Sequence, residues 1–210
     1  GAIPTSPLHF SKCATKEVGR FIKEHHYSHT YSDSISHAFK LELNGQLAGA
    51  CLFGWMAGNR KGMCVLEGLD DPSLYRELMR LVLLDEVPKN SESKFIGWCL
   101  RWLKKEGNLM AVISFADPAF GHSGTIYRAS NWIYTGVQKQ TRPKLIVNGE
   151  SVHPRVMFDR YGTSSINKLR KFGLNVLEEG LTLPKHRYVY ILHPEFGYSL
   201  KSSLRLPLSI

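Results

Sequence analysis

The stretch Ile113–Gly136, ISFADPAFGHSGTIYRASNWIYTG, decides the fold because it predicts a strand, a loop and a helix in direct succession. Residues 111–115 are a short apolar run typical of a buried strand, and Asp117-Pro118 ends that run. A glycine-containing loop over 119–124 then leads into a helix expected over 125–133. Because α/β proteins carry reactive side chains where strands end, we expect the active site in this stretch.

The rest of the chain shows hydrophobic periodicity and turn residues that predict a mixed α/β fold. Asn44-Gly45 and Asn148-Gly149 predict hairpin turns, and Gly107 ends a helix that starts at Asn90 or Ser91 with Ser91 as its expected N-cap. We expect an open mixed sheet with helices on both faces. The other predicted elements are helices over 11–24 and 164–171 and strands over 37–43, 46–55, 144–147, 151–157 and 188–192. Residues 75–84 predict either a strand or a short helix followed by a strand.

Length and composition predict one soluble domain. A chain of 210 residues, 43% hydrophobic and 21% charged, suits one α/β core over 1–210, with a loose tail expected over 200–210. The chain has no apolar run that would span a membrane, and its start lacks the pattern of a signal peptide, so we expect a cytoplasmic protein. Widely spaced cysteines predict free thiols rather than a zinc site or disulfides. They are Cys13, Cys51, Cys64 and Cys99.

A net charge of +9 and a pI of about 9.4 favour a polyanionic partner, although many basic proteins bind no nucleic acid. The basic residues follow the predicted aromatic helix and crowd the last third of the chain, where aromatic residues alternate with them. Basic groups neutralise phosphates, and aromatic faces stack on an unstacked base, although several of these aromatics also suit a core. The expected nucleic-acid contacts are Trp132, Tyr134, Arg142, Lys144 and Arg155.

Three long strings of sequence together resemble the Mom DNA-modification proteins of Mu-like phages. They are residues 113–136, the string RLVLLDE over 80–86 and the string PKNSES over 88–93. The resemblance extends from about His25 to Tyr161. It implies a divergent single-domain fold of the GCN5-related acetyltransferase type. It also implies a host-cytoplasmic enzyme that adds a carbamoylmethyl-type group to adenine N6 in phage DNA and so protects that DNA from restriction.

The resemblance places a cofactor loop before the helix that begins near Ser91. In ordinary acetyltransferases of this type, a glycine-rich loop presents backbone N–H groups to the pyrophosphate of acyl-coenzyme A. The corresponding residues here, VPKNSES over 87–93, contain no glycine, and Glu92 would oppose a phosphate. Acyl-coenzyme A and another group donor therefore stay open as alternatives. The expected cofactor contacts are Lys89, Asn90, Ser91 and Ser93.

The resemblance also pairs His26 and Tyr27 with Asp117 and places an iron among them. Imidazole, phenolate and carboxylate groups all ligate iron, and three ligands leave coordination positions open. Asp117 is the candidate general base and Tyr27 the candidate proton relay. The plainer alternatives are that His26 is a solvated helix-end residue, that Tyr27 packs in the core and that Asp117 caps a turn.

Tyr127 and Ser123 are further catalytic candidates. Tyr127 lies where it could act as an acid or a ligand, although an aromatic at helical spacing is more often a core residue. Ser123 follows His122 in the glycine loop and could polarise a substrate, or it could be an ordinary loop residue. A Ser-His-Asp triad with Asp117 is disfavoured because the chain lacks the sequence G-x-S-x-G.

The chemistry sets what such an enzyme must do. Adenine N6 is a weak nucleophile, so the enzyme must take up its proton and hold donor and acceptor in line. Because N6 takes part in base pairing, we expect the adenine to be flipped out of double-stranded DNA. An alkylated amine differs from the amide that attack on an acyl thioester would give, so the donor stays open. The competing functions are a small-molecule N-acyltransferase using acyl-coenzyme A and a non-catalytic DNA-binding protein.

Overall fold

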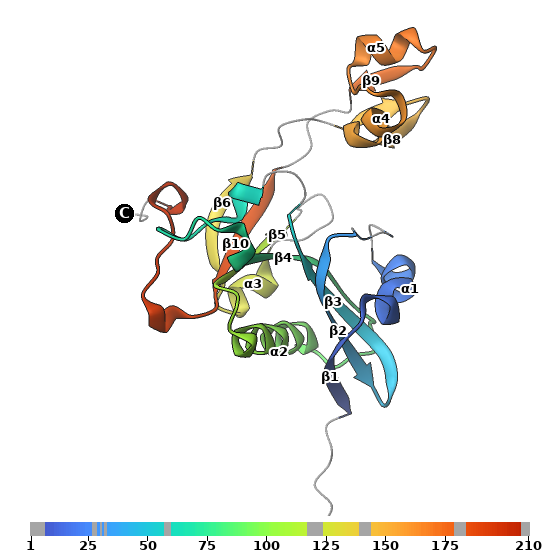
Figure 1. The fold of residues 1–210 in the computed structure, drawn as a ribbon. Coiled ribbons are helices and arrows are strands. Elements are labelled where there is room, and N and C mark those ends of the chain that lie inside the picture. Colours follow the sequence, from blue (N-terminus) through green and yellow to red (C-terminus); the bar gives the residue numbers. More distant parts are fainter. Residues whose placement is uncertain are drawn as a thin grey trace, which may run out of the picture. The chain divides into compact units, whose positions relative to one another are not determined.

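The computed structural model describes residues 7–26, 29, 31, 33–56, 60–116, 124–138, 144–178 and 184–206 (Figure 1). The contacts group the chain into two compact units, which are described separately. The first unit draws on Gly1–Ala116, Gly124–Gly136 and Arg187–Ile210, and the second on Asp117–Ser123 and Val137–His186. That the whole chain folds as one domain stays a prediction.

The first unit is built on a seven-stranded sheet with the order β1-β2-β3-β4-β5-β10-β6. It confirms the predicted open mixed sheet with helices. None of the described helices is both long and apolar enough to cross a membrane. The elements are β1 (Leu8–Cys13), α1 (Thr15–His25), β2 (Ile35–Leu43), β3 (Gln46–Gly54), β4 (Tyr75–Leu83), α2 (Ser91–Glu106), β5 (Ala111–Ala116), α3 (Thr125–Ala129), β6 (Ile133–Gln138) and β10 (Lys185–Ile191).

Helices α1 and α2 lie on opposite faces of the sheet (Figure 1), and alternating side chains of β2 and β3 pack against them. On one face, Ala38, Ala50 and Leu52 pack with Val18, Phe21 and Ile22 of α1. On the other face, Phe39, Cys51 and Phe53 pack with the apolar stripe of α2. Because successive strand residues point to opposite faces, one hairpin supports both layers. The stripe of α2 is Phe95, Ile96, Cys99, Leu100 and Leu103.

Strands β4 and β5 pair in parallel only at their beginnings. Among the described residues, their register runs from Tyr75 opposite Ala111 to Leu78 opposite Ser114, whereas β4 continues to Leu83. On its other side, β4 stays paired with β3 as far as Leu83 opposite Gly49. The second half of β4 therefore leaves β5, and the cavity described below is lined by the end of β4.

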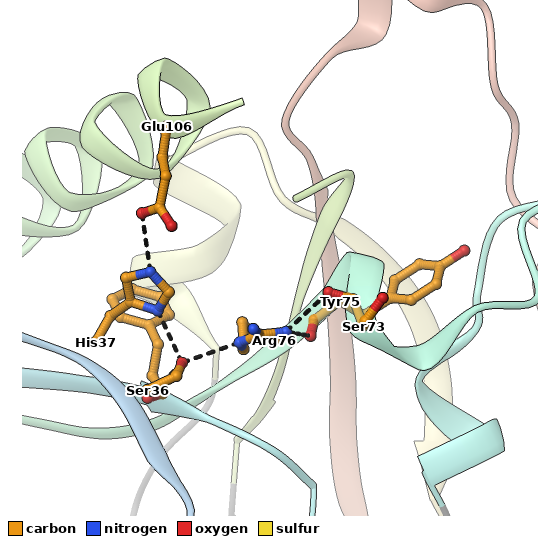
Figure 2. A network of polar contacts seen from close by, with 7 residues as sticks. Ser36, His37, Ser73, Tyr75, Arg76 and Glu106 are labelled. Atoms are coloured by element: carbon orange, nitrogen blue, oxygen red, sulfur yellow. Dashed lines mark hydrogen bonds and ion pairs between the residues drawn. The ribbon is translucent and has the colours of Figure 1, made fainter. Parts of the chain in front are cut away.

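A polar network ties the last residue of α2 to the sheet (Figure 2). His37 Nε2 lies 2.9 Å from Glu106 Oε2, and His37 Nδ1 lies 2.7 Å from Ser36 Oγ. Arg76 Nε of β4 donates to Ser36 Oγ over 2.9 Å, so one chain of hydrogen bonds joins β2, β4 and α2. The Arg76 guanidinium also lies over the Trp55 ring at 3.8 Å.

The network makes stability depend on pH through His37. Burial lowers the pKa of His37 from its usual 6.5, while the hydrogen bond to Glu106 opposes this shift. At pH values between the lowered pKa and 6.5, the folded chain binds fewer protons than the unfolded chain. The contribution of neutral His37 to the free energy of unfolding is therefore complete above pH 6.5 and is lost as the pH falls from 6.5 through the lowered pKa. We expect Glu106→Gln to lower the His37 pKa further, as an NMR titration of the imidazole would measure. A pKa unchanged or raised in that variant would contradict the assignment.

The second unit holds a three-stranded sheet with the order β8-β7-β9 and two helices (Figure 1). Leu145, Val147, Met157, Leu169 and Val176 form its buried core. Asn148 and Gly149 both have positive φ, 49° and 85°, as the predicted hairpin turn requires. The elements are β7 (Leu145–Val147), β8 (Glu150–Val152), α4 (Pro154–Tyr161), α5 (Ile166–Lys171) and β9 (Val176–Glu178).

Several predicted boundaries are wrong. The helix predicted over 11–24 starts at Thr15, because residues 8–13 pair with β2 as an edge strand. The helix predicted over 125–133 ends at Ala129, and the strand predicted over 151–157 is a short strand followed by a helix. The predicted loose tail is also wrong at its start, since Leu200 bridges to Leu66 and buries its side chain. Residues 207–210 lie outside the described part.

The cysteines are free, as predicted, and Cys51, Cys64 and Cys99 are buried. Burial raises the pKa of Cys13 to about 11 and raises the pKa of Cys99 as well. Since the thiolate is the reactive form, a raised pKa keeps a cysteine thiol unreactive. The three buried cysteines therefore act as small apolar residues of the packed interior.

Candidate active site

A cavity of about 360 Å³ lies where β4 ends and α2 begins. One wall is apolar and is formed by the end of β4 together with Ile126 and Ala129 of α3. The lining also includes the loop that the sequence predicts as the cofactor loop, and all four predicted cofactor contacts line the cavity. The lining residues are Leu83, Leu84, Asp85, Val87, Pro88, Lys89, Asn90, Ser91, Glu92, Ser93, Thr125, Ile126 and Ala129.

The start of α2 is shaped by Asn90 rather than by the predicted cap Ser91. Asn90 is the N-cap residue and has a left-handed backbone with φ 68°. The Ser91 hydroxyl donates back to the carbonyl of Pro88, and the Ser93 hydroxyl donates to the carbonyl of Asn90. The first-turn residues Ser91, Glu92 and Ser93 line the cavity, and the positive end of a helix dipole favours an anion, although the Ser91 N–H already donates to the carbonyl of Pro88.

The charges of the lining are mixed. Lys89 and the helix N-terminus favour a phosphate, whereas the carboxylates of Asp85 and Glu92 oppose one. The apolar wall suits the uncharged arm of a carrier molecule. The mixed charges of Lys89, Asp85 and Glu92 suit several phosphates less well. The cavity thus has the place and size of a donor site, but its charges differ from those of a site built for coenzyme A.

Near the end of β5, two hydroxyls meet in the core. Ser114 Oγ donates to the Tyr127 hydroxyl over 2.7 Å, and Ser114 is completely buried. Tyr127 is 9% exposed, and its ring stacks on Tyr188 at 5.1 Å and meets Trp132 edge to face at 5.1 Å. The phenol of Tyr127 is therefore held rigidly beside the strand that leads to Asp117.

We expect Tyr127→Phe to destabilise the first unit by about 1–3 kcal/mol, because the buried Ser114 hydroxyl loses its acceptor. Ser114→Ala in the same background should recover part of that loss, since it removes the orphaned group. Thermal unfolding of both single variants and of the double variant measures the coupling. Strictly additive losses would contradict a direct hydrogen bond.

Of the predicted catalytic residues, the structure describes only His26 and Tyr127. Tyr27, Asp117 and Ser123 lie outside the described residues, so their meeting with His26 stays a prediction. His26 is 5% exposed and follows α1, where its N–H donates to Ile22 O over 2.9 Å. This burial removes the alternative that His26 is merely a solvated helix end.

Metal binding also stays a prediction. Within the described residues, no group of three or more His, Cys, Asp or Glu side chains could hold a metal ion. Two of the three predicted ligands, Tyr27 and Asp117, lie outside that part of the chain. The described side chains therefore do not test the predicted iron site.

The predicted nucleic-acid contacts fall in different places. Trp132 is only 6% exposed and packs in the core, which does not support its predicted role in stacking a base. Tyr134 lies on β6 and is 37% exposed. Lys144 and Arg155 lie exposed in the second unit, where Arg155 forms an ion pair with Asp159 at 3.0 Å. Arg142 lies outside the described residues.

Sequence comparison identifies one protein family. The profile of the Mom protein family matches residues 7–207. A protein described as methylcarbamoylase mom, from Escherichia phage Mu, is 30% identical over 137 residues, which cover 65% of this chain and 56% of that protein. The match thus spans little more than half the length of that relative.

Structural comparison identifies the fold. The ribosomal-protein-S18-alanine N-acetyltransferase of Escherichia coli has a TM-score of 0.51 at 8% identity, with 88% of this chain and 94% of that chain covered. A GNAT family N-acetyltransferase of Escherichia coli in complex with CoA has a TM-score of 0.51 at 11% identity, with 93% and 87% covered. These similarities confirm the predicted acetyltransferase-like fold.

Some residues of this region escaped prediction. Leu83, Asp85 and Thr125 line the cavity although they were not predicted as site residues, because the lining depends on how β4, α2 and α3 pack. Ser114 had a signal in the sequence, since it is a polar residue inside the apolar run AVISFA. A buried polar residue of that kind needs a partner, which here is Tyr127.

Proposed function

Because the chain belongs to the Mom protein family, we propose that it is a phage DNA-modification enzyme of the transferase class. The family match over residues 7–207 carries this proposal, and the name of the phage Mu relative supports it. The acetyltransferase-like fold supports group transfer as the reaction class. The proposed reaction adds a carbamoylmethyl-type group to adenine N6 in double-stranded DNA, with the adenine flipped out.

In this proposal the donor occupies the cavity at the start of α2. Lys89 and the N–H groups of the first helical turn hold its anionic part, and Ile126 and Ala129 contact its apolar part. Asp117 directly follows the last residue of β5 in sequence and takes the proton from N6. Tyr127 positions the reacting groups, and Ser123 polarises the substrate.

The alternative role of Asp117 is that of a metal ligand, in which the iron implied by the family would be held by His26, Tyr27 and Asp117. One imidazole and two oxygen ligands form a donor set that suits iron and leaves positions open for a substrate. The buried setting of His26 agrees with a fixed ligand. Bound there, iron would supply a Lewis acid next to the acceptor.

If the donor is acyl-coenzyme A, the mixed charges in the cavity predict how charge substitutions change the affinity for coenzyme A. We expect Glu92→Gln to strengthen coenzyme A binding about twofold to fivefold and Lys89→Gln to weaken it by a similar factor. Calorimetric titration of the purified protein with coenzyme A measures both changes. Glu150→Gln in the second unit is the control for the change in net charge. Equal affinities in all four proteins would remove coenzyme A from this cavity.

The proposed function is tested by protection of DNA in a bacterium that expresses the chain. Plasmid DNA should resist restriction enzymes whose sites contain adenine, and should still be cut at sites that lack adenine. Full cleavage at both kinds of site would contradict the proposal. Acetylation of a small amine by the purified protein, without protection, would instead select the small-molecule N-acyltransferase.

A further inference from the structure

The second unit presents a surface in which aromatic and basic side chains alternate. We propose that this surface, formed by α4 and α5, docks DNA by binding phosphates and stacking one unpaired base. We define the α4/α5 surface by Arg155, Phe158, Tyr161, Lys168, Lys171 and Phe172. The inference rests on the proposed function in taking DNA as the partner. It goes beyond that function by assigning a docking site within the second unit.

The aromatic residues of the α4/α5 surface are unusually exposed. Phe158 is 51% exposed and Phe172 is 59% exposed, although burying either ring would stabilise the fold. The Tyr161 and Phe172 rings contact each other with centroids 5.4 Å apart and planes 42° apart. Because Phe172 closely follows α5 and Tyr161 ends α4, this contact joins the two helices into one continuous surface. Because the two rings are tilted, each of them singly offers an apolar face to a base.

The cations lie beside these rings. Arg155 is one turn before Phe158 on α4, and Lys168 is one turn before Lys171 and Phe172 on α5. Within the described residues, no ion pair joins Lys168 or Lys171 to a carboxylate. The acid on this surface is Asp159, which pairs with Arg155. The charge therefore favours a polyanion over a protein partner of mixed charge.

A second cavity opens next to the α4/α5 surface. Its volume is about 790 Å³, which lies in the range of ligand sites, and Phe158 belongs to both features. Hydroxyl groups of Thr163, Ser164 and Ser165 line it together with Leu177, and the lining also holds one charge of each sign, Arg170 and Glu178. Its wall thus combines an aromatic ring and aliphatic carbons with small polar groups, as a site for a nucleobase requires.

The charge component is tested with the full chain and a labelled DNA duplex. We expect Lys168→Ala/Lys171→Ala to lower the slope of log affinity against log salt by about 2, because each lost phosphate contact removes about 0.9. The ratio of wild-type affinity to double-variant affinity should therefore fall about tenfold between 50 mM and 200 mM salt. The control is Arg101→Ala/Lys105→Ala on α2, which removes the same charge from an exposed helix in the first unit. Equal slopes in the two double variants would overturn the docking site.

The stacking component is tested with two duplexes, one fully paired and one holding an unpaired adenine. We expect Phe172→Ala to weaken binding of the second duplex about tenfold and to leave the first nearly unchanged. Phe196→Ala is the control, because Phe196 is 56% exposed in the first unit. Unchanged affinity for both duplexes, together with altered self-association in sedimentation, would overturn the proposal and assign the rings to contacts between copies. No donor is present in these assays, so their failure is distinct from failure of the modification reaction.

Discussion

Replacing Asp117 with asparagine is expected to lower DNA modification by about a hundredfold to ten-thousandfold while the protein stays folded and still binds DNA. Asparagine has nearly the same size as aspartate. It cannot accept a proton near neutral pH, and it is a weaker ligand for a hard metal ion. Because Asp117 directly follows β5 in sequence, the loss should affect the reaction rather than the core.

Quantifying modified adenosine in digested DNA, with thermal unfolding as the check on folding, measures this effect. Asp33→Asn is the control, because Asp33 is an exposed acid outside the cavity. Near-native levels of adduct in Asp117→Asn would remove Asp117 from the mechanism. Loss of the adduct in both variants would point to a nonspecific effect of charge.

Gly124→Ala is expected to destabilise the first unit by about 3 kcal/mol and to disturb the aromatic cluster beside β5. Gly124 has φ +77°, a backbone conformation that costs alanine about 1–2 kcal/mol. A Cβ atom there would also overlap the hydroxyl group of Tyr188. Tyr188 is 1% exposed and stacks on Tyr127, so it has little room to move, and such overpacking costs about 1–3 kcal/mol.

Gly68→Ala separates the two components of this effect. Gly68 also has φ +77°, but nothing lies within 4 Å of the position of its Cβ. It should therefore show only the backbone cost, and the difference between the two variants in chemical denaturation measures the overlap with Tyr188. Equal free energies of unfolding in the two variants would contradict the tight packing of Gly124 against that ring.

Local signals predicted much of the fold. The turn at Asn44-Gly45 predicts the β2–β3 hairpin because both residues take up positive φ, 52° and 80°, readily. The helix α2 could be predicted because its apolar stripe has helical spacing and Gly107 ends it with φ 82°. In both cases the local preference and the packing of the finished fold agree.

The errors arose where packing overrides local pattern or where a signal was overlooked. The helix predicted over 125–133 ends early because Asn131 has φ 61°, which is not helical. Strand β6 follows, in which Thr135 exchanges hydrogen bonds with Arg187 of β10. The helix α4 carried a readable signal. Pro154 stands at its start, and the His153 side chain accepts a hydrogen bond from Arg155 N at 3.1 Å.

The candidate site was predicted as a set of loops rather than as a cavity. The cofactor loop could be located because it precedes a clear helix, but part of the apolar wall of the cavity comes from α3, which is distant in sequence. The burial of Trp132 could not be read from its neighbours, since it depends on the placement of Tyr190 and Tyr127 around it. Exposed and core aromatics have similar sequence contexts, and only the fold separates them.

The central claim is that this chain transfers a group to adenine N6 in DNA. The most direct measurement is tandem mass spectrometry of nucleosides from DNA of cells that express the chain, in which fragmentation locates the added mass. The account predicts a modified adenosine with a carbamoylmethyl-type group on N6 in cells with the wild-type chain and near absence of it with Asp117→Asn. Unmodified adenosine in cells that contain the folded wild-type protein, or an added group on another atom, would contradict the claim.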